Sequence, residues 1–186
     1  MIVGYSEVLQ VMAAMVLFSL ILITSNKMIL LNSKKGVETE SEQKAITLAQ
    51  NLINEARLLP FDANTTGGPL QSSEIPDGFS ATGPGSGETT RADFNDFDDY
   101  HTFTNTFDWQ LRPQGHPDFG ESVFTLSIKV LYVQSPDFKM SGGSETNYTE
   151  FKKMVVTVTS DYLTDNNGDP IKIEMPYLRR YYKRAS

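Results

Sequence analysis

The chain has 186 residues, of which 39% are hydrophobic and 21% are charged, and its 23 acidic and 16 basic residues give a formal net charge of −7. This acidic balance argues against general nucleic-acid binding, because proteins of that class usually carry a basic surface. The sequence contains no cysteine, which excludes a disulfide framework, a thiol nucleophile and a cysteine-based metal site. Beyond an apolar N-terminus of about 35 residues, about 150 residues remain, enough for one domain with a real core.

The chain opens with an apolar stretch. The 19 residues from Val8 to Asn26 carry no charge, which approaches the ~20 residues that a helix needs to cross a bilayer. No Lys or Arg precedes Lys27, whereas a secretory signal peptide has a basic start and a small-residue cleavage site. We therefore expect the stretch to stay on the protein. The positive-inside rule would place the lysines that follow the span in the cytoplasm, while the Thr-, Asn-, Gly- and Ser-rich loops downstream favour an extracellular domain.

A helical pattern continues beyond the apolar stretch. Residues 27–59 contain no proline, and from residue 45 the apolar side chains recur at the i, i+3, i+4, i+7 spacing of a helix that buries one face. These side chains are Ala45, Leu48, Ala49, Leu52, Ile53, Ala56 and Leu59. We predict one helix from Tyr5 to Leu59, roughly 80 Å long at ~1.5 Å per residue, which ends before Pro60. Gly36 is its weakest point, and a kink or an unwound stretch is expected between Thr24 and Gly36.

A loop and a sheet follow the helix. Glycine and proline punctuate residues 62–91, and four strand-like runs with period-two alternation come next, at residues 100–111, 123–133, 151–162 and 171–178. This order predicts an α+β fold in which a roughly four-stranded antiparallel sheet packs against the long N-terminal helix. The predicted parts are a membrane or filament-core half of the helix at residues 1–35 and a globular head at 36–186. The head comprises the helix end (36–59), a long loop (60–99) and the sheet (100–186).

Four stretches of the sequence, taken in order, resemble a known family. The helix end AITLAQNLINEARLLPFD, from Ala45 to Asp62, is similar to that of type IV pilin-like minor subunits, most of all those of the mannose-sensitive haemagglutinin pilus and the pseudopilins of type II secretion. The stretch RADFNDFDDYH, from Arg91 to His101, resembles the acidic DDxDDYH sequence before the first strand in that family. Lys129-Val-Leu-Tyr-Val133 and Lys152-Lys-Met-Val-Val-Thr-Val158 fall where the family places later strands.

The resemblance implies a structural protein rather than an enzyme. Subunits of this kind wait in the inner membrane and then, with an assembly machinery, pack their N-terminal helices among copies of themselves in an extracellular filament. The expected function is therefore a subunit of a type IV pilus-like filament that polymerises through its apolar helix, with Tyr5, Glu7 and Leu17 as candidate polymerisation residues. Two alternatives stay open: a minor pseudopilin that primes a secretion or pilus filament, and a membrane-anchored surface binding module such as an adhesin.

The N-terminus departs from the family pattern, which has a basic leader, Gly and then Phe-Thr-Leu-Ile-Glu. Here the sequence is Gly4-Tyr5-Ser6-Glu7-Val8-Leu9. Leader cleavage after Gly4 would make Tyr5 the first residue and Glu7 the third, and Leu9 would stand fifth, where the family has glutamate. An unprocessed terminus at Met1 is the other expectation. Glu7 either pairs with the N-terminal amine of a neighbouring helix or lies hydrated among lipid headgroups.

One candidate metal site stands near the C-terminus. Asp165, Asn167 and Asp169 are spaced like the first oxygen ligands of a calcium loop. Asn167-Gly168 also suits a tight hairpin turn between two strands, and Pro176 stands at the twelfth position, where a calcium loop has glutamate. The hairpin turn is the preferred interpretation and calcium the alternative, and no cofactor is required.

Other polar residues receive plainer interpretations. The acidic residues Asp93, Asp96, Asp98 and Asp99 are expected to cap turns with solvated carboxylates, and a bound cation is the alternative. The two histidines, His101 and His116, are separated by a strand, and the sequence contains no nucleophile elbow, phosphate loop or HExxH pattern. No catalytic residue is therefore predicted.

Overall fold

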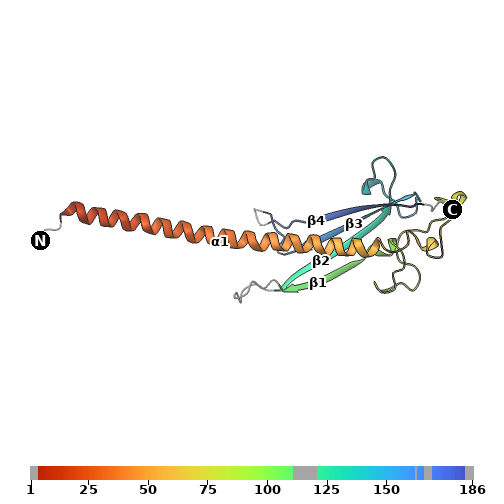
Figure 1. Cartoon of the computed structure of the whole chain (residues 1–186), viewed down its shortest axis with the longest axis horizontal. Coiled ribbons are helices and arrows are strands. Elements are labelled where there is room, and N and C mark those ends of the chain that lie inside the picture. The colour runs from red at the N-terminus through yellow and green to blue at the C-terminus, as the bar shows by residue number, and fades with distance from the viewer. Residues whose placement is uncertain (1–3, 111–120, 162, 166–168, 183–186) are drawn as a thin grey trace. The chain divides into compact units, whose positions relative to one another are not determined.

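The structure is a computed structural model, and it describes residues 4–110, 121–161, 163–165 and 169–182. The chain forms two compact units, Met1–Ser41 and Glu42–Ser186. Helix α1, Tyr5–Ala56, is a single element of 52 residues that begins in the first unit and ends in the second (Figure 1). It is uninterrupted between Thr24 and Gly36, so the expectation of an unwound stretch there is wrong.

The C-terminal end of α1 falls three residues before the predicted one. Beyond Ala56, the N–H groups of Leu58 and Leu59 donate to the carbonyl oxygens of Glu55 and Ala56, three residues back. This tighter turn replaces the α-helical hydrogen bonds as the chain approaches Pro60, because the residue before a proline is disfavoured in the helical conformation.

The predicted α+β fold is confirmed, with the sheet in the second unit. Four strands form one antiparallel sheet in the order β1-β2-β3-β4. Their bounds are β1 Thr104–Gln110, β2 Glu121–Tyr132, β3 Phe151–Ser160 and β4 Ile173–Arg180. The register pairs Thr104 with Ser127, Ile128 with Val156, and Val155 with Pro176. Strand β4 is therefore an edge strand with a proline in its middle.

The end of α1 packs on this sheet, as the apolar spacing predicted. Its buried face consists of Ala45, Ala49, Leu52, Ile53 and Ala56. The sheet contributes Phe124, Leu126, Ile128, Val130, Met154, Val156 and Val158 to the same core. The three alanines have no exposed surface, which allows the helix backbone to approach the sheet closely. Burial of each large side chain contributes about 1.5–3 kcal/mol.

The first strand begins four residues later than predicted, at Thr104 rather than at residue 100. Residues Asp98–Tyr100 form a single 3-10 turn, and Thr102 takes a positive φ of 62°. Both conformations are incompatible with an extended strand. Residues 60–99 contain two further short 3-10 turns, Ala63–Thr65 and Ser72–Glu74, between irregular segments.

Candidate functional site

The predicted polymerisation residues lie on the exposed N-terminal part of α1. Tyr5 is 91% exposed and Leu17 is 61% exposed, and Glu7 is an exposed acidic residue in the first turn. The N–H of Glu7 donates to the carbonyl oxygen of Gly4 at 2.9 Å. A carboxylate suits this position because the free N–H groups of a helix start carry partial positive charge. Tyr5 and Glu7 thus lie together at the helix start. Leu17 lies further along, within residues 8–31, which are called the apolar segment below.

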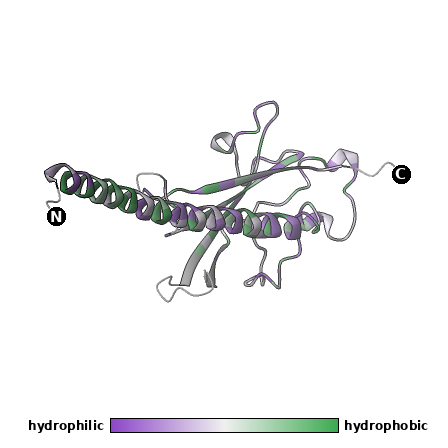
Figure 2. Ribbon diagram, turned by 60° about the vertical axis from the view of Figure 1, so that its left-hand side comes forward, coloured by the Kyte–Doolittle hydropathy of each residue, from purple (hydrophilic) through white to green (hydrophobic). Residues whose placement is uncertain are grey.

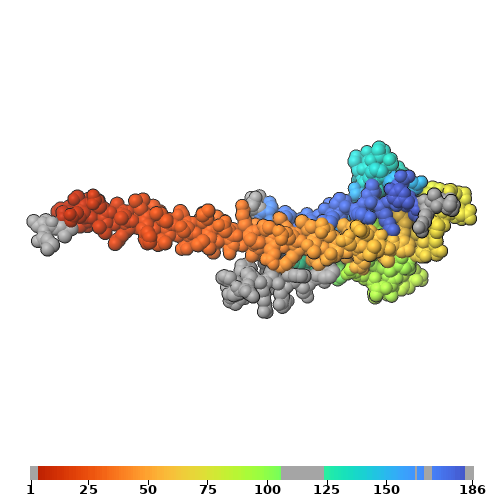
Figure 3. All heavy atoms as spheres, viewed as in Figure 1, coloured from red at the N-terminus to blue at the C-terminus, as the bar shows by residue number. Residues whose placement is uncertain are grey.

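This apolar segment is hydrophobic on every face. Successive residues of a helix are ~100° apart, so four consecutive residues point to all sides of it, and all four side chains are apolar and exposed at 20–23 and again at 28–31. In Figure 2 the N-terminal part of α1 is mainly green, and purple turns become frequent further along. Figure 3 shows the side chains of this part (red) at the surface. The 16 large apolar side chains between residues 8 and 31 are 48% to 70% exposed: Val8, Leu9, Val11, Met12, Met15, Val16, Leu17, Phe18, Leu20, Ile21, Leu22, Ile23, Met28, Ile29, Leu30 and Leu31.

Two hydroxyl groups inside the apolar segment, those of Ser19 and Thr24, find acceptors on the same helix. Ser19 Oγ donates to the carbonyl oxygen of Met15 at 2.8 Å. Thr24 Oγ1 lies 2.9 Å from the carbonyl oxygens of both Leu20 and Ile21. A hydroxyl with a hydrogen-bond partner costs far less to remove from water than a free one. These two polar residues therefore leave the segment suited to lipid or to an apolar partner.

The candidate calcium loop is described only at its two ends. The N–H of Asp169 donates to Asp165 Oδ1 at 2.9 Å, and the N–H of Asp165 donates to the carbonyl oxygen of Asp169 at 2.8 Å. Thr164 and Pro170 form an antiparallel bridge beside them. Asn167 lies outside the described residues. Within the described part of the chain, no group of three or more His, Asp or Glu side chains is arranged to hold a metal ion.

The acidic segment differs from its prediction. Asp93 is exposed and its Oδ2 accepts from the N–H and the hydroxyl of Thr90, as expected of a turn-capping residue. Asp96, Asp98 and Asp99 are at most 1% exposed, so the prediction that their carboxylates are solvated is wrong. They are buried because the Asp98–Tyr100 turn carries them into the head together with Phe97 and Tyr100, which belong to the main core.

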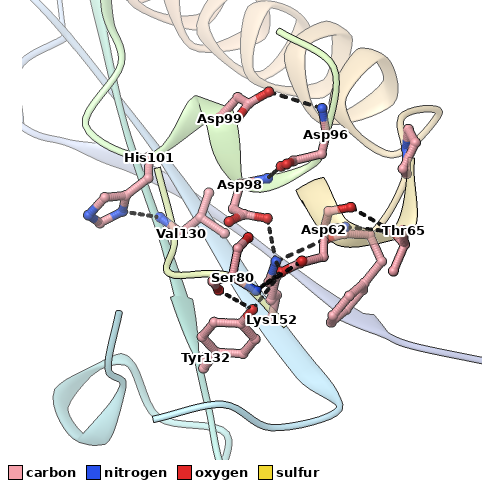
Figure 4. A network of polar contacts seen from close by, with 12 residues as sticks. Asp62, Thr65, Ser80, Asp96, Asp98, Asp99, His101, Val130, Tyr132 and Lys152 are labelled. Carbon is pink, nitrogen blue, oxygen red and sulfur yellow. Dashed lines mark hydrogen bonds and ion pairs between the residues drawn. The ribbon is translucent and has the colours of Figure 1, made fainter. Parts of the chain in front are cut away.

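A buried lysine lies at the centre of this region. Lys152 of β3 has no exposed side-chain surface, and its Nζ lies 2.7 Å from Asp62 Oδ2, 3.0 Å from the carbonyl oxygen of Phe61, and in contact with Asp98 Oδ1. The amine also lies 4.7 Å from the ring centroids of Phe61 and Tyr132. Figure 4 shows both carboxylates pointing toward the amine from different segments of the chain.

Asp62 is held in its ionised form by several donors. Its Oδ1 accepts from the backbone N–H groups of Asn64 and Ser80 at 3.1 and 3.0 Å. Its Oδ2 accepts from the Tyr132 hydroxyl at 2.7 Å and from Lys152. Burial alone would raise the pKa of Asp62, but the charge of Lys152 and these hydrogen bonds outweigh burial, so the pKa lies below its ordinary value.

Asp98 lies in the opposite electrostatic environment. Burial, opposed by the charge of Lys152 and reinforced by the neighbouring charge of Asp96, raises the pKa of Asp98 to about 9. Its Oδ2 is buried and accepts no hydrogen bond from the residues that the structure describes. Burial likewise raises the pKa of Asp96. Burial therefore favours the neutral acid at Asp98, whereas Lys152 and the hydrogen-bond donors around Asp62 favour the carboxylate there.

Sequence reasoning missed Lys152, although one signal pointed to it. Lys152 has the same parity along β3 as the buried residues Met154, Val156 and Val158, and alternate residues of a strand share one face. A lysine in phase with an apolar face is rare, because a buried charge needs a partner. The partners themselves, at positions 62 and 98, could not be located by any local pattern.

Each ring nitrogen of His101 has a partner within the head. Its Nδ1 accepts the backbone N–H of Val130 at 3.1 Å, and its Nε2 lies 3.2 Å from Glu145 Oε1. His116 lies outside the described residues.

Comparison of the chain with protein-family models, with curated proteins and with solved structures finds no match.

Proposed function

We propose that the chain is a structural subunit of a type IV pilus-like extracellular filament, which polymerises through the apolar N-terminal segment of α1. The structural observation behind the proposal is that 16 apolar side chains between residues 8 and 31, on every face of the helix, are exposed and need an apolar partner. Because these side chains are 48% to 70% exposed, covering each one would recover roughly half of the ~1.5–3 kcal/mol that full burial of such a side chain contributes. Two environments provide this cover, a lipid bilayer and a bundle of equally apolar helices.

The bilayer accounts for the protein before assembly. Helix α1 is long and apolar enough to cross a membrane, with a mean hydropathy of 2.3 over its most apolar 18 residues. Ser19 and Thr24 donate within the helix and so add little cost in lipid. We therefore place the chain in the inner membrane before assembly, with α1 as its anchor.

The filament accounts for the rest of the proposal. A single-span anchor would satisfy the hydropathy equally well, so preference for a polymer rests on the pilin-like sequences at residues 45–62 and 91–101. In that arrangement copies of the chain cover one another's apolar segments, the heads form the outer surface, and an assembly machinery extracts the subunits from the membrane. The described residues contain nothing that assigns a catalytic role.

The test is electron microscopy of the fraction sheared from the cells that naturally carry the protein, with the subunit identified by mass spectrometry. We expect thin filaments made mainly of this chain. The N-terminal peptide distinguishes Tyr5, after cleavage behind Gly4, from an unprocessed Met1. An absence of filaments, with all of the chain left in the membrane fraction, overturns the proposal and favours the anchored binding module.

A matched pair of variants locates the polymerisation surface. Leu17→Arg places a charge in the apolar segment and should abolish filaments, whereas Leu58→Arg makes the same change at an 81% exposed leucine after the helix and should leave them. The amount of each variant in the membrane fraction is measured alongside, because a charge also weakens insertion. Filaments of normal length from Leu17→Arg would overturn the proposed role of the segment.

A further inference from the structure

The contact between Lys152 and Asp98 brings a nucleophile against an electrophile inside the head. The side chains are 0% and 1% exposed, and Nζ touches Oδ1, one bond away from the carboxyl carbon Cγ. Residue 98 belongs to the turn before β1, and Lys152 lies in β3, so 54 positions separate the two in the sequence. Such enforced proximity replaces a bimolecular encounter by an intramolecular one, which raises effective concentrations by several orders of magnitude.

The second carboxylate, Asp62, completes the set of groups that amide formation needs. An amine must lose a proton before it attacks a carbonyl carbon, and the attacked acid must be neutral, because a carboxylate repels nucleophiles. Asp62, ionised and 2.7 Å from Nζ, is placed to accept that proton. Asp98, with a pKa raised to about 9 by burial, is the neutral acid.

We propose that the head forms an intramolecular amide bond between Lys152 Nζ and Asp98 Cγ. Asp62 first takes one proton from the Lys152 ammonium. The nitrogen lone pair then forms the C–N bond, a tetrahedral carbon results, and the C–OH bond of Asp98 breaks. The hydroxyl leaves as water with a second proton from the nitrogen. An ammonium, a carboxylate and a carboxylic acid become an amide N–H, one water molecule and a protonated Asp62, so atoms and charge balance without a co-reactant.

The surroundings favour the condensed product. The rings of Phe61 and Tyr132 lie 4.7 Å from the amine, and apolar walls of this kind exclude the water that would reverse the reaction. The bond also replaces a buried ion pair by a neutral amide. Because each buried ion costs several kcal/mol of desolvation even when paired, its removal adds to the driving force.

The test measures the mass of the full chain, purified in detergent and then denatured. We expect a mass lower by one water molecule than the sequence of the same N-terminus requires. Trypsin cleaves after lysine and arginine except where proline follows, as after Arg112, so the bond predicts one branched peptide that joins residues 92–129 to residues 140–153. Cleavage after Lys152 should be lost, because its side chain is then an amide.

Three alternative results overturn the proposal. The first is a chain of unmodified mass that trypsin cleaves normally after Lys152, which would make the cluster a non-covalent ion network. The second is a water loss confined to an unbranched peptide around Asp77-Gly78, where an aspartate can cyclise on its own backbone. The third is a branched peptide that contains residues 58–91, which would assign the bond to Asp62.

Variants separate the reacting groups from general effects on folding. Lys153→Met changes the neighbouring lysine, which donates to the carbonyl oxygen of Phe138, and should retain the full water loss. Asp62→Asn removes the proton acceptor. Most of this variant should still be unlinked at the time when the native chain is fully linked. Equal linked fractions in the native chain and in Asp62→Asn would contradict the assigned role of Asp62.

Discussion

The packing of α1 on the sheet predicts a large difference between two leucines of the same helix end. Leu52 is 2% exposed and belongs to the main core, whereas Leu58 is 81% exposed. Truncation of Leu52 to alanine removes roughly three buried carbon groups at ~0.8 kcal/mol each. The remaining cavity lies between a helix and a sheet, which cannot collapse fully, so we expect a loss of about 3–4 kcal/mol in the free energy of unfolding.

The size of the head determines how far this loss of free energy lowers the melting temperature. The second unit, Glu42–Ser186, gives an unfolding entropy of roughly 0.3 kcal/mol per kelvin. Leu52→Ala should therefore melt about 10 °C lower than the native chain, and Leu58→Ala within about 2 °C of it, because surface changes are worth less than ~0.5 kcal/mol.

The assay is near-ultraviolet circular dichroism of the full chain in detergent. This signal reports the packing of buried aromatic residues such as Phe97 and Tyr100, whereas far-ultraviolet signal would include the apolar part of α1, which detergent keeps helical. A Leu52→Ala melting point within about 2 °C of the native value, or equal losses for the two variants, would refute the inference that this helix face packs on the sheet.

Three further predictions concern single features of the chain. The pKa of Glu55 lies below its ordinary value of 4.5, first through the hydrogen bond from Arg91, so its contribution is present above pH 4.5 and is lost as the pH falls below that value. Glu55→Gln should thus lower the melting temperature more at pH 7 than at pH 3. Because the pair is partly exposed, the effect at pH 7 is worth less than about 1 kcal/mol, and an equal loss at both pH values would contradict the prediction. A Cβ at Gly36 would meet no atom within 4 Å, so Gly36→Ala should raise the stability of the helix by up to about 1 kcal/mol. The same variant should leave the filament yield unchanged. Fewer filaments would show that assembly needs a flexible Gly36. Millimolar calcium should leave the melting temperature unchanged, because Pro176 stands at the twelfth position, where a calcium loop has its glutamate ligand. A calcium-dependent rise that Asp165→Asn abolishes would restore the metal site.

Local periodicity was sufficient to predict the main elements. The apolar spacing from Ala45 to Ala56 identified the helix face that is buried on the sheet. In β3, the alternation of Val156 and Val158 with polar residues located both the strand and its inward face. These patterns are reliable because a helix and a strand each repeat with a fixed period, so burial of one face leaves a regular signature.

Local periodicity could not predict which residues surround the acidic side chains. Asp62 and Asp98 meet Lys152 across 90 and 54 positions of the chain, and their burial depends on how residues 60–103 fold over the sheet. The positive φ of Thr102 belongs to the same irregular path. The exposed positions of Tyr5, Glu7 and Leu17 agree with a helix that needs an apolar partner, but their role in polymerisation stays a prediction.

Strand β4 has one more consequence, which concerns protection from aggregation. An open sheet edge offers unpaired N–H and C=O groups to any other β-strand. In an edge strand, proline is accommodated where its missing N–H faces away from the neighbouring strand. Pro176, paired with Val155, therefore leaves the middle of this edge without a donor. Crowded heads would therefore gain little by joining edge to edge at this strand.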